Sequence, residues 1–370
     1  MKMLCVDRPF PTNIAQWRIE EVKSFIKEMN ADVMSIGSKD ESHNEMCDYY
    51  GLNDYNILIF NPRWNNLNQY NKNFDGRKFN SVNLCDYVYS KEKTFDINKY
   101  DIIYHIFYSR YKTFNTIFTF PQNKQVIHLY PAGGYNKDVI INKDVNLITT
   151  QRYYTDDIKR KGHTKFIEVL GGSMLQKDST YTPRQINERT VRICFSSAVK
   201  HKIGKPYTKG ADIYISAVEK YKKLYKNDNV EFISVGVCPD HKLIKKIDIV
   251  PMEKLKKIYD TVDIYINPET GSPNQGWPLG TESVLRGSVL ITTDPFNSIE
   301  KYPELKDKVI IVDIKDSDSI VSNIKKLYDD RILLNKLSVE TQAITHDLFS
   351  FNNQQQKIFN YIDDIVKNNK

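Results

Sequence analysis

Residues 263–294 read DIYINPETGSPNQGWPLGTESVLRGSVLITTD, and this stretch decides the fold. It predicts an apolar strand at 264–266, a loop rich in Gly, Pro, Ser and Asn, a short helix that carries Glu282 and ends at Gly287, and a second apolar strand at 289–292. In an open parallel sheet such a loop lies beyond the carboxyl end of its strand, where ligands bind and helix-start amides can hold an anion. The segment therefore predicts a ligand site at which a phosphate can dock without a basic residue.

The rest of the chain repeats this alternation of strands and helices. The chain has 370 residues, of which 40% are hydrophobic, and it is longer than a usual domain with a single hydrophobic core. Two domains are therefore expected. Strands are predicted at 3–6, 32–36, 56–60, 101–107, 125–129 and 145–149 and, beyond a polar linker at 176–189, at 191–196, 230–235, 248–250, 264–266, 289–292 and 309–312. Helices are predicted at 14–29, 211–225, 252–261, 317–329, 332–346 and 353–367. The predicted fold class is α/β, with two Rossmann-like doubly wound domains.

Charge and hydropathy restrict the possible partners without choosing one. A formal net charge of +7 permits binding to nucleotide phosphates, to an anionic membrane face or to nucleic acid. The basic segments 157–161 and 242–246 alternate with apolar residues in a helix-like way, and we interpret them as solvated helix faces, with a patch that contacts the inner face of a membrane as the alternative. No apolar run reaches the roughly 18 residues of a membrane span, and the first residues have too short an apolar core for a signal peptide. We therefore expect a cytoplasmic protein.

One set of residues in the stretch 263–294 resembles a motif of a known protein family. It consists of Gln275-Gly276-Trp277-Pro278-Leu279, Glu282-Ser283, Val284-Leu285 and Gly287. This order resembles the nucleotide-binding segment of retaining glycosyltransferases with two facing Rossmann-like domains, the GT-B architecture, and in particular the GT4-like group. Members of that group carry roughly Glu-Gly-Phe-x-Leu, a spacer, then Glu-Ala, an apolar pair and Gly. The resemblance implies that Glu282 binds the ribose of a UDP- or GDP-linked sugar. Gln275 stands where the first family glutamate is expected and Glu269 lies further upstream, so the residue that contacts the donor sugar stays open.

The resemblance also assigns roles to the domains. Residues 1–185 would form the N-terminal, acceptor-side domain and residues 186–350 the C-terminal donor domain. Residues 351–370 would form a C-terminal helix that packs back on the first domain. The cleft between the two domains would hold the chemistry.

Lys209-Gly210 stands at the start of the helix predicted at 211–225, after a lysine-rich loop that contains Lys205. A helix amino end supplies oriented N–H groups and adjacent ammonium groups add full charges, so a diphosphate could be neutralised here. Family members carry a basic residue, a short loop and Lys-Gly before an apolar helix. The resemblance therefore implies a catalytic role for Lys209, in which it stabilises the leaving diphosphate, with Lys205 as its partner. A solvated, lysine-rich loop is the alternative.

Three further sets of residues complete the candidate site. Gly280 and Thr281 could offer backbone and hydroxyl donors to the diphosphate, while Gly236 and Val250 could border the nucleobase or serve turn chemistry alone. His105 lies in the strand predicted at 101–107, and the resemblance makes it a candidate catalytic residue, because in the family a histidine near this point faces the donor sugar. Here the histidine is displaced by one position, which turns it to the other face of a regular strand.

No metal or other cofactor is expected. Asp316-Ser317-Asp318 matches an Asp-x-Asp pattern that metal-dependent glycosyltransferases of another fold use, but it precedes a predicted helix and we interpret it as a helix cap. The five cysteines are scattered without CxxC spacing, so we expect reduced, mostly buried thiols and no structural zinc.

The sequence thus predicts a glycosyltransferase that moves a sugar from a nucleotide-diphosphate donor to a hydroxyl of a glycan or lipid-linked acceptor, with retention, in surface polysaccharide synthesis. Three alternatives stay open: a nucleotide-sugar epimerase, a non-catalytic nucleotide- or carbohydrate-binding protein of the same fold, and a nucleic-acid-binding protein. We do not expect a nucleic-acid partner; affinity that falls steeply with salt would reveal one.

Overall fold

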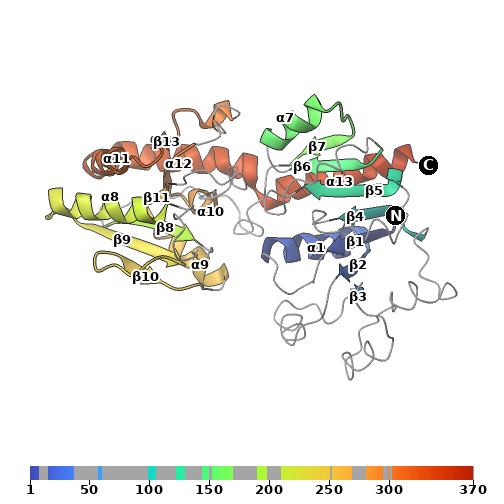
Figure 1. Cartoon of the computed structure of the whole chain (residues 1–370), viewed down its shortest axis with the longest axis horizontal. Coiled ribbons are helices and arrows are strands. Elements are labelled where there is room, and N and C mark those ends of the chain that lie inside the picture. The colour runs from blue at the N-terminus through green and yellow to red at the C-terminus, as the bar shows by residue number, and fades with distance from the viewer. Residues whose placement is uncertain are drawn as a thin grey trace, which may run out of the picture. The chain divides into compact units, whose positions relative to one another are not determined.

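The structure is a computed structural model of the whole chain (Figure 1). It describes residues 1–7, 16–36, 57–60, 99–105, 122–129, 144–149, 152–169, 190–197, 210–250, 252–268, 281–294, 299 and 302–369. The chain divides into two compact units. The first unit comprises Met1–Leu170 together with Gln355–Lys370, and the second comprises Gly171–Gln354.

The first unit is built on a parallel sheet of seven strands in the order β3-β2-β1-β4-β5-β6-β7. The strands are β1 Met3–Asp7, β2 Ala31–Ile36, β3 Ile57–Phe60, β4 Ile102–His105, β5 Gln125–Leu129, β6 Asn146–Thr149 and β7 Phe166–Glu168. The helices are α1 Gln16–Met29, the 3-10 helix η3 Gln122–Lys124, α7 Arg152–Arg160 and, from residue 355 onward, α13 Phe351–Asn368. A central first strand with later strands added on both sides is the doubly wound arrangement.

One face of the first sheet is covered by α1 and α13, which come from opposite ends of the chain (Figure 1). Phe25 of α1 contacts Phe359 of α13, with ring centroids 5.8 Å apart. Ile358 and Ile362 of α13 are buried in the same apolar cluster as Met3 of β1. The C-terminal residues are therefore part of the core of the first unit.

The second unit holds a parallel sheet of six strands in the order β10-β9-β8-β11-β12-β13. The strands are β8 Val191–Ser197, β9 Val230–Gly236, β10 Lys245–Ile247, β11 Ile264–Asn267, β12 Val289–Thr292 and β13 Ile310–Ile311. The helices are α8 Ala211–Leu224, α9 Met252–Tyr259, α10 Thr281–Leu285, η7 Pro303–Leu305, α11 Ser317–Asp329 and α12 Arg331–Phe349. This order repeats that of the first unit, so both sheets are doubly wound, as the sequence predicted.

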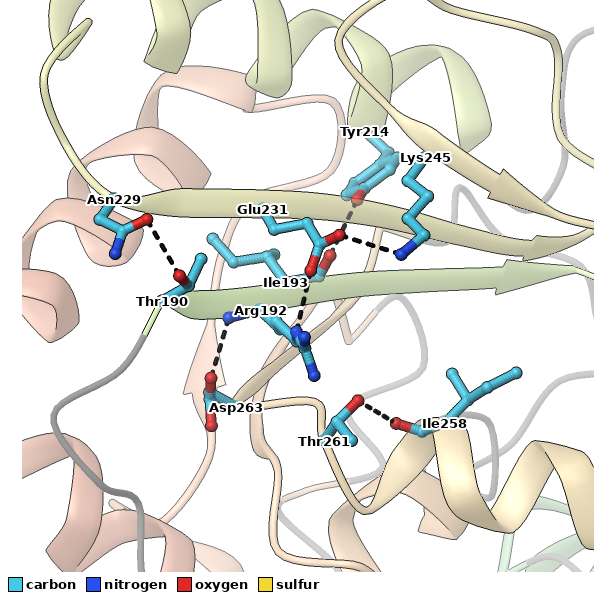
Figure 2. Close-up of polar contacts among 10 residues, drawn as sticks. All are labelled: Thr190, Arg192, Ile193, Tyr214, Asn229, Glu231, Lys245, Ile258, Thr261 and Asp263. Carbon is cyan, nitrogen blue, oxygen red and sulfur yellow. Dashed lines mark hydrogen bonds and ion pairs between the residues drawn. The ribbon is translucent and has the colours of Figure 1, made fainter.

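Polar contacts fix the amino-terminal half of the second sheet (Figure 2). The Arg192 guanidinium of β8 pairs with Glu231 of β9 at 2.8 Å, and Lys245 of β10 pairs with the same carboxylate at 3.3 Å. The Arg192 backbone N–H also donates to the buried Asp263 carboxylate at 2.8 Å. These contacts hold the register of three neighbouring strands, whose opposite ends form the candidate site.

Two local predictions are wrong. The strand predicted at 248–250 lies instead at Lys245–Ile247, and the helix-like pattern at 242–246 belongs to a loop and this strand. The reason is that β10 is an edge strand, which among the described strands pairs only with β9. Its exposed lysines contact solvent and acidic side chains instead of packing on a buried face. The short edge strand β7 was not predicted.

The predicted helix cap and the predicted buried thiols agree with the structure. Asp316 caps α11, because its carboxylate accepts hydrogen bonds from the N–H groups of Asp318 (3.1 Å) and Ser319 (2.9 Å). Cys5, Cys194 and Cys238 are buried free thiols, although Cys238 lies in a loop rather than on a strand. Among the described residues, no helix is long and apolar enough to cross a bilayer, and no cluster of His, Cys, Asp and Glu could hold a metal ion.

Candidate functional site

The six parallel strands of the second sheet end at one edge, and a glycine brings two of these ends into contact. Gly236 ends β9 with φ +86°, and a Cβ placed on it would lie 2.3 Å from the carbonyl oxygen of Ser197, the last residue of β8. The next residue, Val237, donates its backbone N–H to the same oxygen at 2.6 Å. Only glycine allows this close approach of the two strand ends. Val250 lies three residues beyond β10, at the same edge, and is partly exposed.

Gly210 makes a second close approach, between the start of α8 and the end of β11. It adopts the left-handed conformation, with φ 71° and ψ 28°, and a Cβ on it would lie 2.0 Å from the carbonyl oxygen of Pro268. Among the described residues, no side chain caps the start of α8. The uncapped N–H groups therefore lie beside the residue at which the Gly/Pro-rich loop begins, so two segments 58 positions apart in sequence meet at one point.

Asn267 ties β11 to β12 at this edge and was not singled out by the sequence analysis. Its side-chain amide donates to Thr292 Oγ1 at 3.2 Å, and Thr292 Oγ1 donates to the Asn267 carbonyl at 3.1 Å. The Thr293 N–H donates to the same carbonyl at 3.1 Å. The signal in the sequence was the Asn-Pro pair at a strand end, where the chain must turn.

Glu282 lies in the first turn of α10, as the sequence predicted. The residue is partly exposed, but the protein around its carboxyl removes enough water for burial to raise the pKa to about 7. Within the described ranges, no group donates a hydrogen bond to this carboxyl and no cation pairs with it. A carboxylate that is desolvated and not compensated is arranged to accept hydrogen bonds from a ligand.

A buried hydroxyl cluster lies beside Glu282. Ser196 Oγ shares hydrogen bonds with the hydroxyls of Tyr259 (3.0 Å) and Tyr265 (2.5 Å), and the two rings meet edge to face. Burial, with a smaller contribution from the Glu282 charge, raises the pKa of both phenols. These residues hold α9 against the sheet below the candidate site. The alternation of side chains in β11 places Tyr265 on the face of the strand opposite the core-facing Ile264 and Ile266. The contacts of Tyr265 could not be predicted, because Ser196 is distant from it in sequence.

In the first unit, His105 ends β4 and is fully buried, with 0% of its side chain exposed. Burial lowers its pKa to about 4, and a hydrogen bond with Gln125 offsets part of this effect. The imidazole is therefore neutral above this pH. A contact between His105 and the donor sugar stays a prediction.

A second buried polar cluster of the first unit was missed by the sequence analysis. Tyr104 Oη donates to the Glu21 carboxylate at 3.0 Å and lies 2.5 Å from His128 Nδ1, and the histidine is 3.2 Å from the same carboxylate. Three elements, α1, β4 and β5, supply these residues. They lie on the face opposite His105, because Tyr104 and His105 are adjacent on one strand.

Most of the loops that the sequence assigned to the site fall outside the described residues. These predictions concern Lys205, Lys209, Glu269, Gln275, Gly276, Trp277, Pro278, Leu279 and Gly280. Cys47, Cys85 and the linker at 176–189 also lie outside the described ranges. Thr281 is the first residue of α10. The structure therefore brings Gly210, Gly236, Val250, Thr281 and Glu282 to one edge of one sheet.

Comparison with known proteins identifies the fold. No protein-family model and no curated protein sequence matches this chain. Among solved structures, HepE of Anabaena in complex with UDP-glucose is similar with a TM-score of 0.66 and 14% identity, over 98% of this chain and 100% of that one. A glycosyltransferase from Rickettsia africae ESF-5 has a TM-score of 0.67 and 13% identity, over 99% of both chains. A mutant of S. aureus TarM with Fondaparinux, alpha-GlcNAc-glycerol and UDP has a TM-score of 0.67 and 10% identity, over 98% of this chain and 99% of that one. These similarities confirm the predicted two-domain GT-B fold.

Proposed function

We propose that this protein is a glycosyltransferase that moves a sugar from a nucleotide-diphosphate-sugar donor to a hydroxyl group of an acceptor. The observation that carries the proposal is the Glu282 carboxyl, which is desolvated and has no partner among the described residues. A ribose offers two adjacent hydroxyl donors, and a carboxylate can accept both. The contact between Gly210 and Pro268 places the uncapped start of α8 at the same edge of the sheet, where helix amides suit a diphosphate.

The proposed chemistry places charge stabilisation at the leaving diphosphate. As the bond between sugar and diphosphate breaks, negative charge accumulates on the leaving group, and fixed cations and helix amides stabilise that charge more than the ground state. Lys209, with Lys205 beside it, would supply the cations. Gly280 and Thr281 would add donors, and Gly236 and Val250 would border the base. The proposal requires no metal and nominates no nucleophile.

The finer parts of the proposal rest on the resemblance and on the similar structures. HepE was solved with UDP-glucose, and TarM with UDP and alpha-GlcNAc-glycerol. We therefore propose a UDP- or GDP-linked donor, a glycan or lipid-linked acceptor, retention of configuration as in GT4-like enzymes, and a role in surface polysaccharide synthesis. We also propose a cytoplasmic location with peripheral contact to the inner membrane face, since the chain is basic.

A nucleotide panel tests the proposal. The purified protein is heated with UDP, GDP, ADP, CMP and their common sugar conjugates. We expect one nucleotide series to raise the melting temperature by several degrees, because a ligand that binds only the folded state stabilises it by mass action. Mass spectrometry with candidate acceptors then separates the activities: a glycosyltransferase yields free nucleotide and a larger glycan, an epimerase isomerises the donor, and a binding protein leaves it unchanged. Failure of every nucleotide to stabilise the protein contradicts the donor-site assignment.

Donor affinity should depend on pH through Glu282. Only the carboxylate accepts two hydroxyl hydrogens, and the free carboxyl has a pKa of about 7. We therefore expect the dissociation constant of the sugar nucleotide to fall by up to about tenfold per pH unit between pH 5 and 7 and to level off above pH 7. Isothermal titration at several pH values measures this, with the intact sugar conjugate as ligand because its diphosphate does not titrate in this range. A flat profile would contradict the role of Glu282.

A further inference from the structure

Helix α12 has a buried face that changes from apolar to polar along its length. Leu334 and Leu337 are buried in the core of the second unit, and the same stripe then continues with four buried polar side chains. These are Ser338, Thr341, Gln342 and Thr345, with exposed fractions of 0%, 0%, 4% and 0%. Their spacing, i, i+3, i+4 and i+7, places them on one side of the helix. A buried helix face is normally apolar, so these hydrogen-bonding groups need an explanation.

Two of these side chains bind the end of α10. The Ser338 hydroxyl donates to the Gly287 carbonyl at 2.5 Å, and the Gln342 amide donates to the Leu285 carbonyl at 3.0 Å. The carbonyls of Ser283 and Val284 already accept hydrogen bonds from backbone N–H groups of the turn that follows the helix. The carbonyls of Leu285 and Gly287 accept theirs from α12. Both acceptors of these bonds are main-chain atoms, so α12 fixes the backbone at the end of α10 and in the turn that follows it.

Helix α10 needs such support, because it contains only five residues. A single turn is not stable by itself in water. Besides the burial of Val284 and Leu285, its polar contacts include the Ser283–Ser288 hydrogen bond at 2.6 Å and the Ser288 bond to the Val262 carbonyl at 2.9 Å. An exposed Arg286–Asp260 pair follows the helix. Glu282 lies on the same turn, three residues before Leu285. Any motion of the end of α10 therefore moves the Glu282 carboxyl.

We propose that Gln342 and Ser338 are positioning residues for the donor site. By holding the carbonyl of Leu285, the last residue of α10, and that of Gly287 in the turn after it, they keep the Glu282 carboxyl in its desolvated position, and so set the affinity for the sugar nucleotide without contacting it. This inference rests on the proposed function of Glu282 as the ribose acceptor. It also predicts a property of the unliganded protein, because the desolvation of Glu282 itself depends on the two hydrogen bonds.

Gln342→Met tests the inference in the full-length protein, since methionine keeps most of the volume and removes the amide that donates to the Leu285 carbonyl. Thr341→Val is the matched control: Thr341 is equally buried on the same helix and donates to a backbone carbonyl, that of Lys308 at 2.7 Å, outside α10. We expect both variants to melt a few degrees lower. Gln342→Met should weaken binding of the sugar nucleotide about tenfold and move the pH midpoint of binding below 7, whereas Thr341→Val should change neither. Ser338→Ala should resemble Gln342→Met.

A measurement without ligand separates this inference from the proposed function. In the wild-type and Thr341→Val backgrounds, Glu282→Gln should raise the melting temperature at pH 8, because it removes a desolvated charge. In the Gln342→Met background this rise should disappear, since a released carboxyl regains water. If Glu282→Gln stabilises all three backgrounds equally, α12 does not position Glu282 and the inference is wrong. If the cycle behaves as expected but no nucleotide binds, the positioning holds and the proposed function fails.

Discussion

Glu282→Gln is expected to weaken sugar-nucleotide binding about 100-fold and, at pH 8, to raise the melting temperature of the unliganded protein. Binding falls because the neutral amide carries only one acceptor oxygen and presents an N–H₂ group to a ribose hydroxyl. Stability rises because the wild-type protein holds a desolvated carboxylate that no described residue compensates. The measurements are isothermal titration with the sugar nucleotide and thermal melting without it.

The direction of the pH dependence follows from the two pKa values of Glu282. Burial raises the folded-state pKa from 4.5 to about 7, so between these values the folded protein holds a proton that the unfolded chain has lost. Stability therefore falls as pH rises from about 4.5 to 7, and the full cost, about 1–3 kcal/mol, is present above pH 7. The difference in melting temperature between Glu282→Gln and wild type should be small at pH 4, grow towards pH 7 and then stay constant.

Glu231→Gln provides the matched control for this prediction. Glu231 lies on the same sheet but at its amino-terminal half, where its carboxylate is paired with Arg192 and Lys245. Its replacement removes two ion pairs that are partly exposed, so we expect a small loss of stability and unchanged nucleotide affinity. Equal loss of affinity in the two variants would show that the effect is not specific to the candidate site.

A carboxyl such as Glu282 illustrates a conflict between stability and binding. The protein is expected to be more stable without the charge, yet the charge is what a ribose would bind. Such groups are typical of binding sites, where a ligand supplies the missing hydrogen bonds. The ligand-free protein therefore carries an unfavourable contribution to folding that donor binding would relieve.

Strongly periodic or apolar segments were predictable from the sequence. The apolar runs at β5 and β12 were predicted with their observed bounds, and Asp316 was correctly interpreted as a cap, because each signal is local. By contrast, β10 was placed three residues too late. Its exposed lysines form salt bridges with Glu231 and Asp240. The spacing of residues along the sequence does not identify these partners.

The candidate site was only partly predictable, for the same physical reason. Glu282 and Gly210 were predicted from short motifs that resemble the family, and the structure places both at the same edge of the second sheet, while their roles stay predictions. The contact between Gly210 and Pro268 depends on how α8 meets β11 and cannot be deduced from either motif alone. The polar stripe of α12 was also missed, because buried Ser, Thr and Gln look like surface residues until their carbonyl partners are known.

Gly210→Ala is expected to destabilise the second unit strongly. Alanine disfavours φ +71°, and its Cβ would lie 2.0 Å from the Pro268 oxygen, 2.7 Å from the Pro268 carbonyl carbon and 2.9 Å from Cγ of the proline ring. Two of these atoms are backbone, so the clash cannot be relieved by rotating a side chain, and either the start of α8 or the end of β11 must shift. We expect a loss of about 3 kcal/mol or more in the free energy of unfolding. Denaturant unfolding measures this loss.

The same shift should separate the start of α8 from the loop after β11, so sugar-nucleotide affinity should fall more than tenfold even at temperatures where Gly210→Ala remains folded. Gly162→Ala is the control, because Gly162 also has a positive φ of 74° but lies exposed in a turn after α7, in the first unit. It should cost about 1 kcal/mol and leave nucleotide affinity unchanged. If the two variants are equally stable, the crowding at Pro268 is not a constraint on the fold. If Gly210→Ala is destabilised but binds the nucleotide as tightly as wild type, the start of α8 takes no part in holding the diphosphate.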